Sequence, residues 1–172
     1  MARASDYYFS LPQRDRPAPF PLNEQRVPHY QWDLANRARA RGGHRINKIT
    51  TVVIHATAGF ATQHALDAWR SARASAHWIV PDEDEPQHGK FVWSVVSESL
   101  AAFHVLDSKT HADLGNVLRV NDYGLGIEIV NTQDVQNYTD PYSDWQVEQT
   151  AILVRYCWAK YPNLRHVISH AR

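Results

Sequence analysis

Several features that define other protein classes are scarce in this sequence of 172 residues. Neither sign of charge is in excess, because 18 Lys and Arg residues balance 18 Asp and Glu residues, so the net charge does not favour nucleic acid as a partner. The single cysteine, Cys157, cannot form an internal disulfide, so the fold does not rely on oxidation. No apolar run approaches the length of a transmembrane segment, and the first residues lack the apolar core of a signal peptide. We expect a protein that stays in the cytoplasm or is exported without a cleaved leader.

The N-terminal part of the chain differs in composition from the rest. Five of the nine prolines lie within residues 1–48, and proline fixes φ and removes a backbone donor, which discourages regular structure. We expect residues 1–48 to form an irregular arm laid on the domain and anchored by Tyr30 and Trp32. The basic residues of the arm form either a solvated face or linker, or a surface that meets an anionic polymer; they are Arg37, Arg39 and Arg41.

Residues 49–172 alternate strand and helix patterns, which predicts a single α/β domain with a sheet flanked by helices. A chain of this size buries roughly 70% of its unfolded surface, enough for one core. Short β-branched or aromatic runs predict strands at 50–54, 75–80, 91–96, 125–131 and 166–169.

Two helices are expected between these strands. The first runs from Thr62, a possible N-cap, to Arg73. The second begins at an S-x-x-Q capping box, Ser143 to Gln146, and is stopped by Pro162. Cys157 lies on its apolar face and is most simply core packing.

Ten histidines are many for this length and make metal or proton chemistry worth seeking. His55 follows the most β-branched strand, and the small residues 56–59 after it leave room beside its ring. An α/β fold exposes reactive groups at such a strand end. Taken alone, His55 could equally be a histidine that hydrogen-bonds the end of a strand. His170 follows the last expected strand in the same way.

One carboxylate, Glu128, lies inside the apolar strand at 125–131. Burial without a partner is costly and favours the neutral form of a carboxyl group. Strand alternation places Leu125, Ile127 and Ile129 on one face and Glu128 on the other. Glu128 is therefore either a general base directed into a site or the partner of an arginine at the sheet edge.

Five segments together resemble the zinc-dependent N-acetylmuramoyl-L-alanine amidases, which share a fold with peptidoglycan recognition proteins: T-T-V-V-I-H-A-T-A-G, A-S-A-H-W-I-V, A-A-F-H-V, N-D-Y-G-L-G-I-E-I-V-N and H-V-I-S-H. The resemblance covers residues 49–172 in the right order and leaves the arm outside. It implies a mixed β-sheet flanked by helices, a peptidoglycan or muropeptide substrate, and a bacterial or phage source. It also makes delivery to the cell wall by phage lysis or a secretion machine an alternative to the cytoplasm.

The resemblance assigns roles to individual residues. His55 and His170 match zinc ligands of the family, and Glu128 matches the acidic residue that activates water. His77 and His104 match histidines that face the substrate, although F-H-V-L replaces the usual W-H-A-G around His104. The activity implied is hydrolysis of the amide bond between N-acetylmuramic acid and L-alanine.

Two other functions remain open at this point. The same fold without a full ligand set would bind peptidoglycan or muropeptide without cutting it, and a zinc-free α/β domain would use these histidines structurally. The third ligand of the family, an Asp or Cys, follows the second histidine closely in sequence, and no residue after His170 supplies it here. We therefore expect the 172 residues to be a shortened form that holds zinc weakly through His55 and His170.

Overall fold

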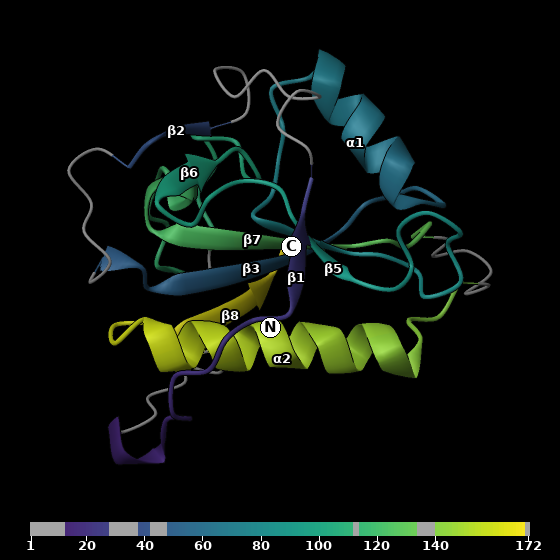
Figure 1. Cartoon of the computed structure of the whole chain (residues 1–172). Helices are drawn as coiled ribbons and strands as arrows, with labels where there is room; N and C mark the ends of the chain where they lie inside the picture. The colour runs from purple at the N-terminus through teal and green to yellow at the C-terminus, as the bar shows by residue number, and fades with distance from the viewer. Residues whose placement is uncertain (1–12, 28–37, 42–47, 112–113, 134–139, 171–172) are drawn as a thin grey trace.

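The computed structural model describes residues 13–27, 38–41, 48–111, 114–133 and 140–170. A six-stranded sheet forms the middle layer of the molecule. One long helix covers one face of this sheet, and a shorter helix together with a two-stranded sheet lies over the other (Figure 1). The prediction of a single α/β domain is confirmed.

The six strands run in the spatial order β1-β5-β4-β7-β3-β8. They are β1 (Glu24–Arg26), β3 (Thr51–Ala56), β4 (Trp78–Val80), β5 (Val92–Ser94), β7 (Gly124–Ile129) and β8 (His166–Ser169). Strands β4 and β5 pair antiparallel, and the other neighbours pair parallel. The sheet is therefore mixed, and β7 and β3 lie inside it with partners on both sides.

The remaining elements complete the two outer layers. They are the strands β2 (Ala38–Ala40) and β6 (Leu100–Ala102), the helices α1 (Thr62–Ser71) and α2 (Asp144–Lys160), and the short 3-10 helices η2 (Gln13–Asp15) and η7 (Val120–Asp122). Strands β2 and β6 pair antiparallel over the face of the sheet opposite α2.

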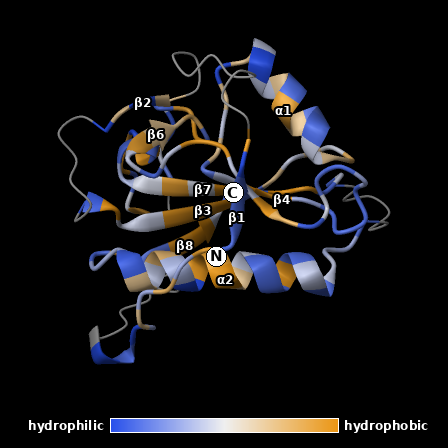
Figure 2. Cartoon of the chain, viewed as in Figure 1, coloured by the Kyte–Doolittle hydropathy of each residue, from blue (hydrophilic) through white to orange (hydrophobic). Residues whose placement is uncertain are grey.

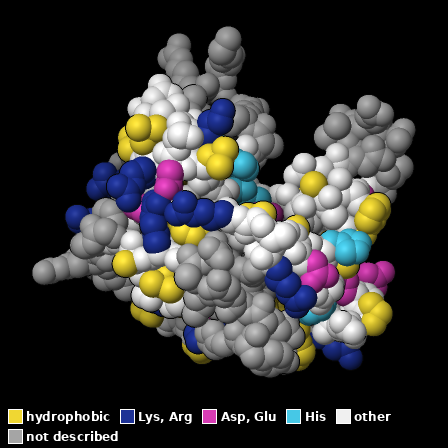
Figure 3. Space-filling view, turned by 90° about the horizontal axis from the view of Figure 1, so that it is seen from above, with side chains coloured by type: hydrophobic (Ala, Val, Ile, Leu, Met, Phe, Trp, Pro, Cys, Tyr) yellow, Lys and Arg dark blue, Asp and Glu magenta, His cyan; other side chains and the backbone are white. Residues whose placement is uncertain are grey.

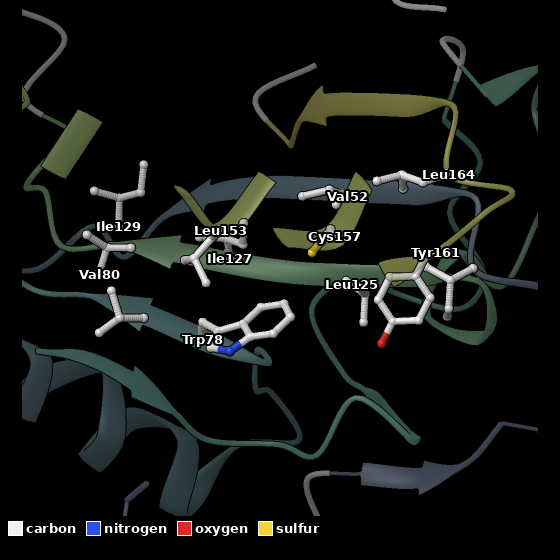
Figure 4. Close-up of a cluster of buried hydrophobic side chains, with 12 residues drawn as sticks. Val52, Trp78, Val80, Leu125, Ile127, Ile129, Leu153, Cys157, Tyr161 and Leu164 are labelled. Atoms are coloured by element: carbon white, nitrogen blue, oxygen red, sulfur yellow. The ribbon is translucent and has the colours of Figure 1, made fainter. Parts of the chain in front are cut away.

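The main core lies between α2 and the sheet. Hydrophobic residues are concentrated in the central strands, while both helices carry hydrophilic and hydrophobic residues in turn (Figure 2). Val52, Leu125 and Ile127 contribute from the sheet, and Leu153 and Cys157 from α2, all with no exposed surface (Figure 4). Cys157 is thus a core residue, as predicted.

Helix α2 begins at the capping box that the sequence indicates. The Ser143 side chain accepts a hydrogen bond from the Gln146 amide, and the Gln146 side chain accepts one from the Ser143 amide. Gln146 itself is buried on the same face as Cys157, and its Nε2 donates to the carbonyls of Pro81 and Val130. A polar residue can occupy this face because both of those carbonyls need a donor.

Helix α1 lacks the N-cap that the sequence suggested. Ala61 holds the cap position without a side-chain bond, so the prediction for Thr62 is wrong. The Glu85 carboxylate instead accepts from the Thr62 amide at 3.0 Å and from its hydroxyl at 3.0 Å. A carboxylate suits the positive end of a helix whether it comes from the helix or from a distant loop.

Described parts of the arm are built into the domain. Strand β1 extends the edge of the main sheet, and Glu24 on it accepts a hydrogen bond from Trp78 Nε1 at 2.6 Å. Arg16 donates to the carbonyls of Tyr161 and Leu164, where α2 has ended. The expected anchors Tyr30 and Trp32 lie outside the described residues. The anchors seen are charged side chains and the two short strands β1 and β2, which are regular elements within the arm.

Candidate functional site

Three parallel strands bring the predicted site residues to one end of the sheet. His55 on β3 is the register partner of Glu128 on β7, so the two side chains project from the same face of neighbouring strands. On the other side of β3, the amide of His170 donates to the carbonyl of Ile54 at 2.9 Å. Residues more than 40 positions apart in sequence thus become direct neighbours.

The histidines of this end form a compact group. The rings of His55 and His170 have centroids 4.5 Å apart, and those of His55 and His104 lie 5.2 Å apart. Nε2 of His55 is 3.1 Å from Nδ1 of His104. If His55 donates in this bond, the lone pair of its Nδ1 is left free for another partner.

All three rings favour the neutral form. Burial lowers the pKa of His55 well below its usual value, and the neighbouring His104 and His170 lower it further. The pKa of His104 falls in the same way, through burial first and then through His77 and Arg41. Burial also lowers the pKa of His170. Neutral imidazole is the form that binds metal ions.

Glu128 carries a carboxyl group that is poorly solvated. Burial raises its pKa to about 8. Its Oε2 atom is buried and makes no hydrogen bond within the described part of the chain. Because β7 lies inside the sheet, the alternative of an arginine pair at the sheet edge does not apply. A carboxyl group with a pKa near neutrality suits proton transfer.

His104 lies flat against the backbone of β7. A Cβ atom at Gly126 would approach Cγ of His104 to 2.6 Å, a distance that real side chains do not reach. Glycine at this position of the N-D-Y-G-L-G-I-E segment therefore makes room for the ring.

His77 is placed differently from the other predicted residues. It has no exposed surface, Gly126 N donates to its Nδ1 at 2.9 Å, and its Nε2 lies 3.1 Å from the carbonyl of Leu100. Burial lowers the pKa of His77 to about 3, and Arg41 adds to the effect. Nε2 also lies 2.8 Å from Nη2 of Arg41, so both ring nitrogens of His77 have polar partners within the fold. This geometry belongs to a residue that fixes strand β7, and the assigned contact with substrate stays a prediction.

Of the three basic residues, Arg39 and Arg41 are described, and neither serves the roles that the sequence suggested. Arg41 is buried and donates to backbone carbonyls, and Arg39 pairs with Asp107 and Asp122. Arg37 lies outside the described residues. Sequence reasoning also passed over Asn121, whose side chain bonds the backbone beside His104. Its place in the N-D-Y-G segment was a signal that could have pointed to it.

The donor set fits a zinc ion in part. His55 and His170 are neutral imidazoles from separate strand ends, which are suitable zinc ligands. Among the described residues, no group of three His, Cys, Asp or Glu side chains is arranged to hold a metal. Histidine side chains lie on the wall of a hollow in the surface (Figure 3). Of the predicted zinc ligands, His170 is exposed and His55 is buried.

Comparison with solved structures supports the same fold. AmpDh3 from Pseudomonas aeruginosa matches with a TM-score of 0.61 at 23% identity, over 84% of this chain and 56% of that one. AmiD from E. coli, solved with anhydro-N-acetylmuramic acid-L-Ala-D-gamma-Glu-L-Lys, matches with a TM-score of 0.59 at 26% identity, over 77% and 51% of the two chains. A selenomethionine derivative of AmpD matches with a TM-score of 0.61 at 18% identity, over 88% and 83%. The chain thus spans little more than half the length of AmpDh3 and AmiD.

Sequence comparison leads to the family directly. Among proteins of curated function, none matches this sequence significantly. No helix in the described ranges is long and apolar enough to cross a bilayer. Residues 45–172 match the family described as Amidase_2, N-acetylmuramoyl-L-alanine amidase. Since this match spans most of the sequence and carries His55, Glu128 and His170, the chain belongs to the N-acetylmuramoyl-L-alanine amidase family.

Proposed function

We propose that this chain hydrolyses the amide bond between N-acetylmuramic acid and L-alanine in peptidoglycan or muropeptides, with zinc as its cofactor. The observation that carries the proposal is the placement of Glu128, with a pKa of about 8, beside His55 at the strand end that also holds His170. The class of substrate is supported by relatives solved with anhydromuramic peptides.

In this proposal His55 and His170 hold the metal through neutral imidazole nitrogens. Zinc supplies Lewis acidity, which makes water a stronger acid and an amide carbonyl a better electrophile. In this proposal Nε2 of His55 donates to Nδ1 of His104, which leaves Nδ1 of His55 for the metal and keeps the ring in one orientation, as the second partners of metal-bound histidines do.

Glu128 moves the proton. Its carboxylate accepts a proton from the attacking water, and the resulting carboxyl group gives that proton to the leaving amine nitrogen of L-alanine. A pKa near neutrality lets one group serve both steps, since neither protonation state is strongly disfavoured at the working pH.

A second function is a non-catalytic muropeptide-binding module. The observation that favours it is that the described residues hold no group of three metal-ligating side chains. Two ligands alone should bind zinc more weakly than three.

One experiment separates the two functions. The purified protein is titrated with zinc, its metal content is measured by emission spectroscopy, and a muramoyl-peptide is added while the release of the L-alanine amine is followed. Zinc-dependent release supports the amidase, and binding of the muramoyl-peptide without release supports the binding module. Release that is unaffected by a chelator would contradict the role of zinc.

His55→Ala tests the ligand assignment in the same assay. We expect a marked fall in the zinc-to-protein ratio, because one of the two imidazole donors is lost. His64→Ala is the matched control, since His64 is exposed on α1. A zinc content equal to that of the parent would reject His55 as a ligand.

A further inference from the structure

A buried guanidinium group from outside the family match lies beside His77 and the start of β7. Arg41 precedes residues 45–172, and its side chain is buried. It donates to the carbonyls of Glu98, Asn121 and Gly124 at 3.0 Å each and to that of Asp122 at 3.1 Å. Burial lowers the pKa of Arg41 to about 10, so the group remains charged at neutral pH.

Those contacts fix η7 and the start of β7. An arginine has five N–H donors in a rigid fork, and here the fork gathers carbonyls from two segments of chain. A shorter or apolar side chain would leave these buried carbonyls without a donor, which is costly. Arg39 strengthens the same region, since it donates to Asp122 Oδ1 on η7 at 2.6 Å.

The side chain of Asn121 links η7 to the segment that contains His104. Its Oδ1 accepts from the amide of His104 at 3.2 Å and from the amide of Val105 at 3.0 Å, and its Nδ2 donates to the carbonyl of Val105. The backbone that follows β6 therefore depends on Asn121 for its position.

The ring of His104 completes the series of contacts. It lies against Gly126 and meets Nε2 of His55 through its Nδ1 at 3.1 Å. Neither Arg41 nor Asn121 is hydrogen-bonded to His55. Asn121 bonds the backbone of His104, and Arg41 also lies 2.8 Å from Nε2 of His77, whose ring centroid is 5.9 Å from that of His104.

We propose that Arg41 and Asn121 are positioning residues for His104, with Arg41 holding the backbone of Asn121 and Asn121 holding the backbone of His104 against His55. Residues 38–41 of the arm then help to position a residue of the candidate site. The consequence for turnover rests on the proposed amidase function, whereas the positioning itself does not.

Amide hydrogen exchange in the metal-free full chain tests the positioning. The variants are Arg41→Met, Arg41→Lys and Asn121→Ala, and the control is Arg70→Met, an exposed arginine on α1. Exchange at the amides of His104 and Val105 is compared with exchange at Leu153 in the core of α2. We expect Arg41→Met and Asn121→Ala to speed exchange at the two amides about tenfold relative to Leu153, the scale of one lost hydrogen bond. Arg41→Lys, which keeps the charge and some of the donors, should have a smaller effect.

Arg41→Met is the decisive variant because Arg41 touches neither amide. Unchanged exchange at His104 and Val105 would overturn the proposal, and so would a rise that is equal at Leu153, since that indicates general destabilisation. Faster exchange at the two amides alone supports it, even if the parent protein cuts no muropeptide and the proposed function fails.

Turnover provides the second readout. In muramoyl-peptide hydrolysis we expect kcat of Arg41→Met and Asn121→Ala to fall about tenfold with KM unchanged, because neither residue is placed to bind substrate. A change in KM alone would assign these residues to substrate binding and contradict a positioning role. Arg70→Met should match the parent in both constants.

Discussion

The two faces of strands β3 and β7 carry opposite chemistry although the same short segments form both. Towards α2 they present Val52, Leu125 and Ile127, which pack with Leu153 and have no exposed surface. Towards β6 they present polar groups, among them His55 and Glu128. Alternation along each strand separates the two sets, because successive side chains point to opposite faces.

The faces also differ in what holds them together. The apolar face depends on buried area and close packing, which are non-directional. The other face depends on particular partners, such as the Gly126 amide for His77 and the Asn121 side chain for the His104 backbone. Substitutions on the first face should therefore change stability, and those on the second should change activity or pH dependence first.

The largest effect is expected at Glu128 on the polar face. Glu128→Gln should lower turnover of muramoyl-peptide by about 10² to 10⁴, or about 3 to 5 kcal/mol, because the amide cannot accept and return a proton. The zinc content and the melting temperature should not fall. Turnover within threefold of the parent would show that another group is the base.

On the apolar face, Leu153→Ala should lower the free energy of unfolding by about 2 to 5 kcal/mol, since it leaves a cavity in the core. Denaturant unfolding measures this, with Val147→Ala as control on the exposed side of the same helix. At a temperature where the variant stays folded, its zinc affinity should equal that of the parent. A parallel loss of zinc affinity would mean that the two faces are not independent.

Gly126→Ala tests where the faces meet, in the backbone of β7. The new methyl group would overlap the ring of His104, and overpacking of this kind costs about 1 to 3 kcal/mol. Histidine side-chain NMR should show the His55–His104 hydrogen bond lost. Gly59→Ala is the control, because a Cβ there makes ordinary contact with His64 at 3.5 Å. A preserved hydrogen bond in Gly126→Ala would refute the packing described for His104.

The smallest effect concerns pH. The folded pKa of His77 is about 3, whereas in unfolded chains histidine titrates near 6.5, so below that value the unfolded chain binds more protons. The contribution of neutral His77 to stability is therefore fully present above about pH 6.5. As the pH falls from about 6 to about 4, the free energy of unfolding should decrease by about 1.4 kcal/mol per pH unit, because the unfolded chain takes up a proton that the folded chain does not.

His77→Asn keeps an acceptor for the Gly126 amide and removes the titration. We expect its free energy of unfolding to depend less steeply on pH over this range than that of the parent, in denaturant titrations of the metal-free proteins. His64→Asn, on the exposed surface of α1, is the control. Equal slopes for the parent and His77→Asn would mean that His77 is not buried in its neutral form.

Periodicity and composition were sufficient for the elements that depend on local sequence. The β-branched run before His55 and the apolar strand around Glu128 form the two neighbouring strands β3 and β7, and the capping box at Ser143 starts α2. The same patterns failed where a distant group replaced a local one. Glu85 caps α1 in place of Thr62, and β1 joins the sheet edge within a proline-rich segment.

Sequence by itself thus determined most strands and both helices of residues 49–172 and the residue types of the candidate site, because alternation, capping and buried polarity act within a few residues of the chain. Only the tertiary structure decided which histidines meet, with His55 beside His104 and His170 and with His77 enclosed beneath them. It also decided the use of Arg41, whose charge in the sequence indicates a solvated surface and whose position in the fold is among buried carbonyls. The physical reason is that hydrogen bonds and burial depend on distance in space, and the folded sheet brings together groups that no local pattern connects.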